Sequence, residues 1–267
     1  MAALFISTIP WFTFVMPIYT IPDIHGQREM LEGALALIEA DGATAQDEVI
    51  FLGDYVDRGP DSRGVLDVLI TGLGQGRRWT CLLGNHDRMM LRYLTDGTVT
   101  DPQIKSGLQW THRRFGGTAM ATYGVDATAQ ISATELHAQF ARAVPRSHVD
   151  FLASLSSVEV RGDLLFAHAG IRPGVPLKDQ HQDDLVWIRA EFLDHTDPHP
   201  WLVVHGHTAI PAPRHFGNHI DLDGGAAMGR PLAVAVFEGH SCFLLTQGGR
   251  VPLLPEPLSP DEVAPWA

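Results

Sequence analysis

The sequence predicts an α/β fold, and two features of the chain lead to that prediction. In the first half, a short apolar run, a polar loop and an amphipathic segment follow one another repeatedly. The polar residues after these runs, Asp23, Asp54 and Asn85, recur at equal intervals, close to the length that a βαβ unit needs. From Val158 onward, apolar runs return in quick succession. Alternating strands and helices of this kind are typical of sheets covered by helices.

Three predicted strands of the first half end in polar loops. Four apolar residues, Val49–Leu52, lead through a glycine to Asp54, as a buried parallel strand does when it ends at a polar rim. Right-handed crossovers would bring all three loops to one edge of one sheet. Polar groups that are far apart in sequence would then meet there. The other two strands and the helix between the first two are predicted at Pro17–Ile21, Thr80–Leu83 and Gln27–Ala40.

Residues 89–150 differ from the parts on either side because they are mostly helical in character. The clearest helical segments are Gln103–Phe115 and Ala133–Ala143. We interpret this stretch as a helical insertion beside the site, within one domain that spans residues 16–250. Residues 251–267 are rich in proline and are expected to form an extended strap or a loose end.

The composition is that of a globular protein with an acidic balance. The 267 residues include 31 acidic and 19 basic side chains, which give a net charge of −12. This charge repels the phosphates of DNA and RNA, so we expect no nucleic-acid partner. Phosphate substrates stay open, because bound metal cations can reverse the local field. Fourteen histidines, several of them beside Asp or Gly, suit metal chemistry.

The sequence predicts no targeting segment and no membrane association. Residues 1–15 are apolar, but no basic residue precedes them, no small-residue cleavage pattern follows, and Pro10 interrupts them. We therefore expect the functional chain to begin near Met16, after an extension. Cys81 and Cys242 lie in apolar runs as strand thiols, and two cysteines do not build a disulfide framework. A reducing cytoplasm is the expected location.

Five predicted strand ends carry ligand-type residues next to glycine. Taken singly, each motif is weak: Asp54 alone would be better interpreted as a helix cap, and a lone histidine such as His205 is more often structural. Together they are hard to explain by five unrelated structural roles. The five motifs are Asp23-x-His25, Asp54-x-x-Asp57-Arg58, Asn85-His86-Asp87, His168 and His207.

Mixed Asp, His and Asn side chains favour borderline divalent metals over all-oxygen Mg or Ca sites. We expect two such ions, with Mn preferred and Fe, Zn or Co as alternatives. Two ions about 3.5 Å apart can hold both the attacking and the leaving oxygen of a phosphoryl displacement. A shared carboxylate gives that spacing, and Asp54 is the expected bridge.

The order of these motifs resembles that of the calcineurin-like metallophosphoesterases, and it is most similar to the bacterial branch of the phosphoprotein phosphatase family. The resemblance spans about Ile18–Phe237, and its most specific part is Gly53–Gly59, with the sequence Gly-Asp-Tyr-Val-Asp-Arg-Gly. It implies a four-layer sandwich of two mixed β-sheets flanked by helices, with a dinuclear site at one edge. One departure is Pro22, where the family usually has a glycine before the first aspartate.

The resemblance also implies a set of metal ligands. One ion takes Asp23, His25 and the shared Asp54. The other ion takes Asp54 together with Asn85, His168 and His207. A hydroxide that bridges the two ions is the implied nucleophile.

Catalytic roles follow from the same resemblance. His86 is expected to be the general acid at the leaving-group oxygen. Asp87 is expected either to orient His86 or to cap the following helix, and the sequence leaves both open. Arg58 offers a planar fork for phosphate oxygens, and Arg189 stands where the family places a second arginine. Two rivals, Arg172 and Arg214, are interpreted as surface charges.

The leading functional hypothesis is hydrolysis of phosphomonoesters, with phosphoserine or phosphothreonine in protein as the substrate that the resemblance implies. The alternative is symmetric cleavage of diadenosine tetraphosphate, because relatives with that activity share nearly all of these motifs but often lack the counterpart of Asp57. A catalytically inactive binding module would need a lost ligand, and none is missing. The sequence does not indicate the oligomeric state.

Overall fold

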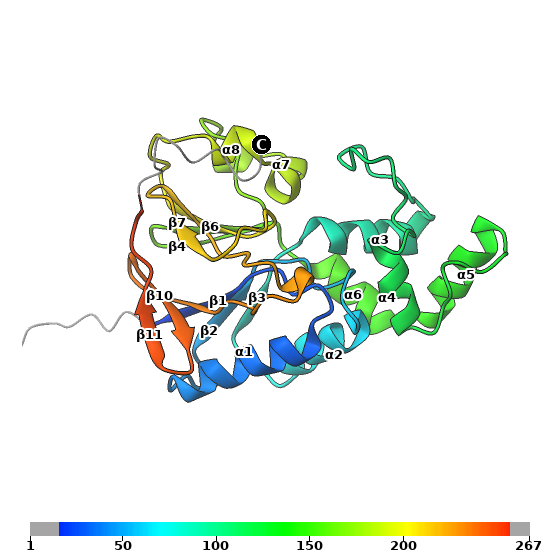
Figure 1. Ribbon diagram of the computed structural model, residues 1–267, viewed down its shortest axis with the longest axis horizontal. Helices are drawn as coiled ribbons and strands as arrows, with labels where there is room; N and C mark the ends of the chain where they lie inside the picture. Colours follow the sequence, from blue (N-terminus) through cyan, green and yellow to red (C-terminus); the bar gives the residue numbers. More distant parts are fainter. Residues whose placement is uncertain (1–15, 257–267) are drawn as a thin grey trace, which may run out of the picture.

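The computed structural model describes residues 16–256, whose strands form two mixed sheets lying face to face (Figure 1). The first sheet has the order β11-β10-β9-β1-β2-β3, in which β1 pairs in parallel with β2, and β2 with β3. Its strands are β1 (Ile18–Ile21), β2 (Glu48–Phe51), β3 (Trp79–Cys81), β9 (Ala235–Glu238), β10 (Ser241–Thr246) and β11 (Gly249–Pro252).

The second sheet has the order β4-β5-β6-β8-β7. Here the β5–β6 and β6–β8 pairs are parallel, whereas the two outer pairs are antiparallel. Its strands are β4 (Val158–Arg161), β5 (Leu164–Ala167), β6 (Leu202–His205), β7 (Arg214–His215) and β8 (His219–Asp221).

Helices cover the outer face of each sheet, which gives four layers. Helices α1 (Arg28–Ala40) and α2 (Ser62–Gly74) lie on the first sheet, and α7 (Gln182–Trp187) and α8 (Ala190–Leu193) lie on the second (Figure 1). Three apolar clusters fill the spaces between the layers, and the one between the sheets centres on side chains such as Phe166 and Phe237. The predicted sandwich of two mixed sheets flanked by helices is confirmed.

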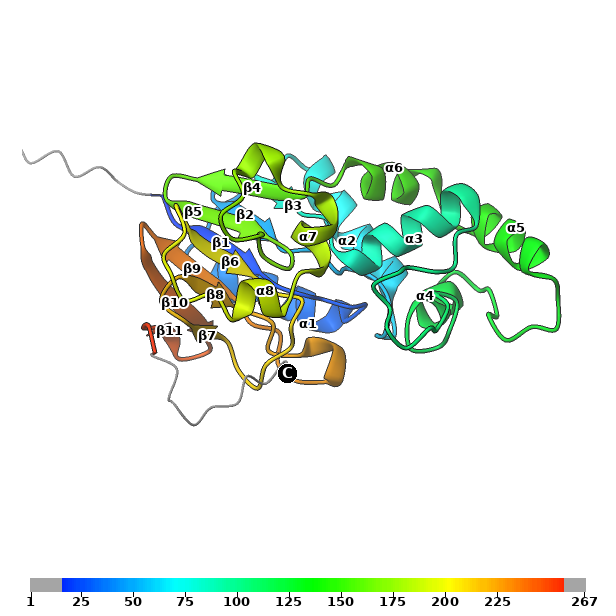
Figure 2. The ribbon, with the colours of Figure 1, turned by 90° about the horizontal axis from the view of Figure 1, so that it is seen from above.

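Four further helices lie beyond one end of the sandwich in both ribbon views (Figures 1 and 2). They are α3 (Asn85–Asp96), α4 (Gly116–Thr122), α5 (Ala133–Ala143) and α6 (Arg146–Ser154). The prediction of a helix over Ala133–Ala143 is confirmed, but the one over Gln103–Phe115 is wrong. That stretch forms consecutive turns, because Gly107 takes a left-handed φ of 66° and Trp110 is drawn into the interior.

The predicted domain end also differs from the structure. Strand β11 pairs with β10 through Val251 and Pro252, so the first sheet continues past residue 250. The predicted extension over residues 1–15 and the end of the tail lie outside the described residues. None of the helices in the described part of the chain is sufficiently long and apolar to cross a membrane.

Candidate metal centre

The loops at the carboxyl ends of β1, β2, β3, β5 and β6 meet in one buried cluster. Asp54 Oδ2 lies 3.3 Å from His25 Nε2, and Asp54 Oδ1 lies 3.5 Å from His168 Nε2. Two groups of side chains have ligand atoms close enough to hold a metal ion: His25, Asp54 and His86, and Asp54, His168 and His207. Asp54 belongs to both groups, which is the arrangement that a bridging carboxylate requires.

The remaining two predicted ligands lie at the edge of these groups. Asp23 Oδ2 is 3.8 Å from His25 Nε2, and Asp23 Oδ1 accepts the backbone N–H of His207 over 2.9 Å. Asn85 Oδ1 is 3.0 Å from His168 Nε2. The structure therefore brings together all six side chains that the sequence analysis selected as metal ligands.

Several histidine ring nitrogens in the cluster lack a hydrogen-bond partner or lie beside an oxygen atom to which they cannot donate. Metal-binding histidines have such unsatisfied nitrogens before they bind a cation. His25 Nδ1 lies 2.8 Å from the carbonyl oxygen of Val56, which fixes the proton there and leaves Nε2 as a buried lone pair without a partner among the described residues. His207 Nε2 is likewise buried and unpartnered within residues 16–256. His168 has an oxygen 3.0 Å from each ring nitrogen, Leu52 O and Asn85 Oδ1, although a neutral imidazole can donate only once.

The electrostatics of the cluster also fit bound cations. Burial raises the pKa of Asp54 to about 7 and holds that of Asp23 well above its usual range, with the negative charge of Asp223 contributing at both. Burial lowers the pKa of His168 to about 3 and that of His207 well below its ordinary value, so these rings are neutral. Neutral imidazoles and buried carboxylates are the donor set that divalent transition metals take.

Backbone strain is concentrated at the same place. Among residues 16–256, the non-glycine residues with positive φ are His25, Asp54, Asp57, Arg58 and His207, and all five belong to the motifs at the predicted strand ends. A glycine is required opposite Asp54, because a Cβ on Gly84 would lie 2.1 Å from Asp54 Oδ1 and 2.2 Å from its backbone nitrogen. Strained loops pressed against each other hold the ligand atoms in place.

His86 is paired with Asp57, and its tautomer follows from its neighbours. Arg58 Nη2 lies 3.0 Å from His86 Nε2, and since a guanidinium can only donate, Nε2 must accept. The proton therefore sits on Nδ1, which donates to Asp57 Oδ2 over 2.7 Å. Burial raises the pKa of Asp57, and an indole N–H from Trp110, 2.9 Å from the same oxygen, opposes that shift.

The expectation that Asp87 orients His86 is corrected by these contacts. Asp87 accepts the backbone N–H groups of Gly84, Asp54 and Tyr55 over 2.7 to 3.0 Å. Its position in the first turn of α3 directs the carboxylate back toward the helix N-terminus, away from the adjacent His86 ring. Asp87 thus caps α3, which is the other role that the sequence left open, and ties this helix to the loop of Asp54.

The candidate arginines differ in their contacts. Arg189 Nη1 donates to Thr208 Oγ1 over 2.8 Å. Burial lowers the pKa of its guanidinium, and the carboxylates of Asp23 and Asp54 oppose that shift, which places Arg189 near the cluster. Arg172 forms a two-pronged ion pair with Asp184. Arg214 lies in β7, at the edge of the second sheet, and pairs with Glu256 at 3.6 Å.

His205 is a buried structural residue, as a lone histidine more often is, and it forms a hydrogen bond with His219 over 2.9 Å.

A cavity of about 560 Å³ adjoins the cluster between the 103–105 loop and the α7–α8 helices. One of its lining residues, Trp187, lies edge-on to His207 with ring centroids 5.7 Å apart. The acidic lining residues all pair with arginines: Asp183 with Arg88, and both Asp184 and Glu191 with Arg172. Lys105 and Arg189 are the lining cations that form no ion pair within the described part of the chain.

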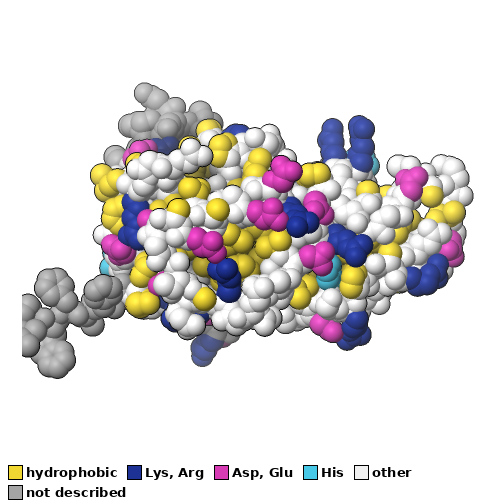
Figure 3. Space-filling view, turned by 90° about the horizontal axis from the view of Figure 1, so that it is seen from below, with side chains coloured by type: hydrophobic (Ala, Val, Ile, Leu, Met, Phe, Trp, Pro, Cys, Tyr) yellow, Lys and Arg dark blue, Asp and Glu magenta, His cyan; other side chains and the backbone are white. Residues whose placement is uncertain are grey.

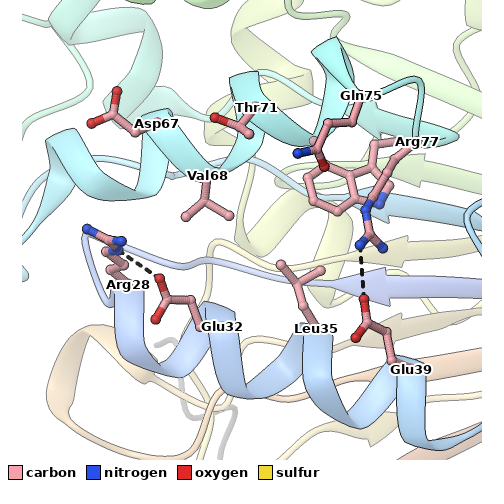
Figure 4. Close-up of a pocket in the computed structure, with 11 residues that line it drawn as sticks. Arg28, Glu32, Leu35, Glu39, Asp67, Val68, Thr71, Gln75 and Arg77 are labelled. Carbon is pink, nitrogen blue, oxygen red and sulfur yellow. Dashed lines mark hydrogen bonds and ion pairs between the residues drawn. The ribbon is translucent and has the colours of Figure 1, made fainter.

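A second cavity, of about 390 Å³, lies between α1 and α2 on the outer helical layer (Figure 4). Its polar groups neutralise one another in the pairs Arg28–Glu32 and Arg77–Glu39. Figure 3 shows the face of the molecule on this side, where charged side chains of both signs are interspersed around an apolar hollow. This groove holds none of the ligand-type clusters, so the metal centre lies elsewhere.

Comparison with known proteins places the chain in a family. The family model described as calcineurin-like phosphoesterase matches residues 16–242, and the chain belongs to this family of metal-dependent phosphoric ester hydrolases. It is 27% identical over 243 residues to the asymmetrical bis(5'-nucleosyl)-tetraphosphatase PrpE of Bacillus velezensis, covering 82% of this chain and 88% of that protein.

Two further similarities are informative in different ways. Over 76 residues the chain is 43% identical to the symmetrical bis(5'-nucleosyl)-tetraphosphatase of an Acidovorax species. This match covers 28% of this chain and 25% of that protein. The structure of a protein serine/threonine phosphatase from Saccharomyces cerevisiae has the same fold, with a TM-score of 0.53 at 17% identity, covering 93% of this chain and 82% of that one.

Proposed function

We propose that the protein hydrolyses dinucleoside tetraphosphates with the help of two divalent metal ions. One observation carries the proposal: the buried cluster of unpartnered ligand atoms adjoins a cavity in which Lys105 and Arg189 form no ion pair among the described residues. A chain of phosphates that begins at the metals would be attracted by these two cations. The similarity to PrpE, named as an asymmetrical tetraphosphatase, extends over most of both chains and supports the same substrate class.

The roles of the site residues follow from their contacts. Asp23, His25 and Asp54 would hold one ion, and Asp54, Asn85, His168 and His207 the other. Two ions, which we propose to be Mn, would polarise the scissile phosphate and activate water at neutral pH.

The cationic and proton-donating groups lie close to these ligands. Arg58 now donates to His86 Nε2, and a phosphate that engages Arg58 would free this nitrogen to carry a proton toward the leaving group. Asp57 would stabilise the imidazolium that results, since its carboxylate is bonded to Nδ1. Arg189 would bind phosphate oxygens from the cavity side.

Hydrolysis of phosphoserine or phosphothreonine in proteins is the second candidate. It is favoured by the pairing of His86 with Asp57, a residue that the resemblance associates with protein phosphatases. An alkoxide is a poor leaving group and needs a general acid, whereas a nucleotide leaves readily as an anion. A fixed proton donor is therefore of most value for a phosphomonoester.

The two candidates are separated by assaying the Mn-loaded protein on diadenosine tetraphosphate and on a panel of phosphoserine and phosphothreonine peptides. We expect the dinucleotide to be cleaved to AMP and ATP, because the relative that covers most of the chain is an asymmetrical enzyme. Formation of two ADP molecules would indicate symmetric cleavage. Release of phosphate from the peptides alone would overturn the proposed substrate class.

A further inference from the structure

The helical insertion reaches the pair formed by His86 and Asp57 through one side chain. Trp110 is 1% exposed, and its indole Nε1–H donates to Asp57 Oδ2 over 2.9 Å. The same oxygen lies 2.7 Å from His86 Nδ1. Two donors therefore converge on one carboxylate oxygen, whereas Asp57 Oδ1 is buried without a partner among the described residues. The contacts at Oδ2 fix the orientation of this carboxylate.

The indole is itself held firmly by the insertion. The backbone nitrogen of Trp110 donates to Val99 O over 2.6 Å. Its ring centroid lies 5.0 Å from that of Tyr93 in α3 and 5.8 Å from that of Phe140 in α5. A Cβ on Gly116 would lie 2.1 Å from the indole, so the following turn is pressed against its face. Close packing on all sides makes the N–H a donor with a fixed direction.

The same turn also covers the His86 ring. The ring of Phe115 lies 5.6 Å from that of His86 at an interplanar angle of 30°, and the ring of His25 meets His86 edge-on at 4.8 Å. His86 is therefore bounded by the insertion through Phe115, by a predicted metal ligand through His25, and by Asp57 through Nδ1.

We propose that Trp110 is a positioning residue that holds Asp57, and through it His86, in the geometry needed for proton donation to the leaving group. The inference rests on the proposed role of His86 as general acid. Loss of the indole N–H leaves Oδ2 with one donor and lets the carboxylate turn about its side-chain bonds. The Nδ1–H of His86 then loses a fixed acceptor, and Nε2 loses its fixed direction.

The test is the substitution Trp110→Phe, which keeps an aromatic ring between Tyr93 and Phe140 but removes the N–H. Phe140→Leu is the matched control, because it loosens the same aromatic cluster without touching Asp57. The readout is the ratio of kcat/KM for p-nitrophenyl phosphate to that for phenyl phosphate. The phenyl ester releases a phenolate about as basic as tyrosine and depends on a proton donor, whereas the nitrophenolate leaves unaided.

Trp110→Phe is expected to raise this ratio roughly tenfold over the wild type, with Phe140→Leu unchanged. His86→Asn marks the upper limit of the change, about 10² to 10⁴. A ratio of two substrates does not depend on how much of a variant is folded. A ratio for Trp110→Phe equal to that of the wild type would overturn the inference.

A second readout keeps the inference separate from the proposed function. In the zinc-loaded protein, the Nδ1–H proton of His86 should give a downfield NMR signal that is absent from His86→Asn. We expect the signal to be broadened or lost in Trp110→Phe and retained in Phe140→Leu. If the wild type hydrolyses neither aryl phosphate, the proposed general-acid chemistry fails, and the NMR signal alone decides: retention in Trp110→Phe refutes the positioning role.

Discussion

Replacing Asp54 with asparagine should stabilise the metal-free protein and remove the stabilisation that metals confer. Asp54 is 1% exposed, and burial raises its pKa from 3.8 to about 7. Because the pKa in the folded state lies above that of the unfolded chain, the metal-free wild type loses stability as the pH rises from about 4 to about 7. Above pH 7 the loss is complete and amounts to at most about 4 kcal/mol.

Asparagine fits the same place without a new unpaired group. Its Oδ1 can still accept the backbone N–H of His86, which lies 2.9 Å from Asp54 Oδ1. Its amide nitrogen would face His25 Nε2, a lone pair that is 3.3 Å from Asp54 Oδ2 and lacks a donor in the described part of the chain. In EDTA at pH 8 the variant should therefore unfold at a higher temperature than the wild type.

Added Mn should reverse this order, so that the wild type unfolds at a higher temperature than Asp54→Asn. A ligand at about 100 times its Kd stabilises the folded state by about 2.7 kcal/mol, which raises Tm by roughly 5 to 11 °C for a chain of this size. We expect the wild type to show this shift with Mn and Asp54→Asn to show none. Asp150→Asn, on the exposed face of α6, is the control and should behave as the wild type. These shifts in Tm are measured by thermal unfolding monitored with circular dichroism. A less stable variant in EDTA, or a full Mn shift in the variant, would refute the reasoning.

Three more predictions address other parts of the site. His86→Asn should lower kcat for phenyl phosphate, whose leaving group needs a proton, about 10² to 10⁴-fold while elemental analysis still finds both metals; unchanged kcat would remove the general-acid role. Gly84→Ala should abolish the Mn-dependent rise in Tm, because its Cβ would overlap Asp54, whereas Gly33→Ala, whose new Cβ meets nothing within 4 Å beyond its own helix backbone, should retain it. Lys105→Ala should raise KM for diadenosine tetraphosphate roughly tenfold but leave that for p-nitrophenyl phosphate unchanged; equal effects on both would show that the cavity does not bind the distal phosphates.

The sequence was sufficient to predict which of the candidate ligand side chains meet, because they obey a simple geometric rule. Asp54 and His168 lie in the loops that follow buried parallel strands, and the carboxyl ends of such strands share an edge of a sheet. Local patterning therefore determined which side chains meet, although they lie far apart along the chain. The equal spacing of Asp23, Asp54 and Asn85 carried the same information.

The partner of His86 was not predictable in this way. Asp87 is adjacent in sequence, but a side chain in the first turn of a helix points back to the free backbone N–H groups. Asp57 reaches His86 because its backbone adopts a φ of 73°, a conformation that its sequence gives no reason to expect. The signal that could have identified it was its fixed place in the Gly53–Gly59 motif.

The structure of the helical insertion was likewise not predictable from local sequence patterns alone. The apolar residues of Gln103–Phe115 suggest a helix by periodicity alone, whereas the buried contacts of Trp110 with Tyr93, Phe140 and Asp57 require turns. Tertiary packing overrides local preference where the gain from burying a large aromatic side chain exceeds the preference for a helix. That override also places the indole N–H against Asp57.

Anomalous diffraction from a crystal grown with Mn tests the central claim most directly. The account predicts two Mn peaks per chain about 3.5 Å apart, both within bonding distance of Asp54, with His25 on one peak and His168 and His207 on the other. A single peak, or no peak at Asp54 in the presence of saturating Mn, would contradict it.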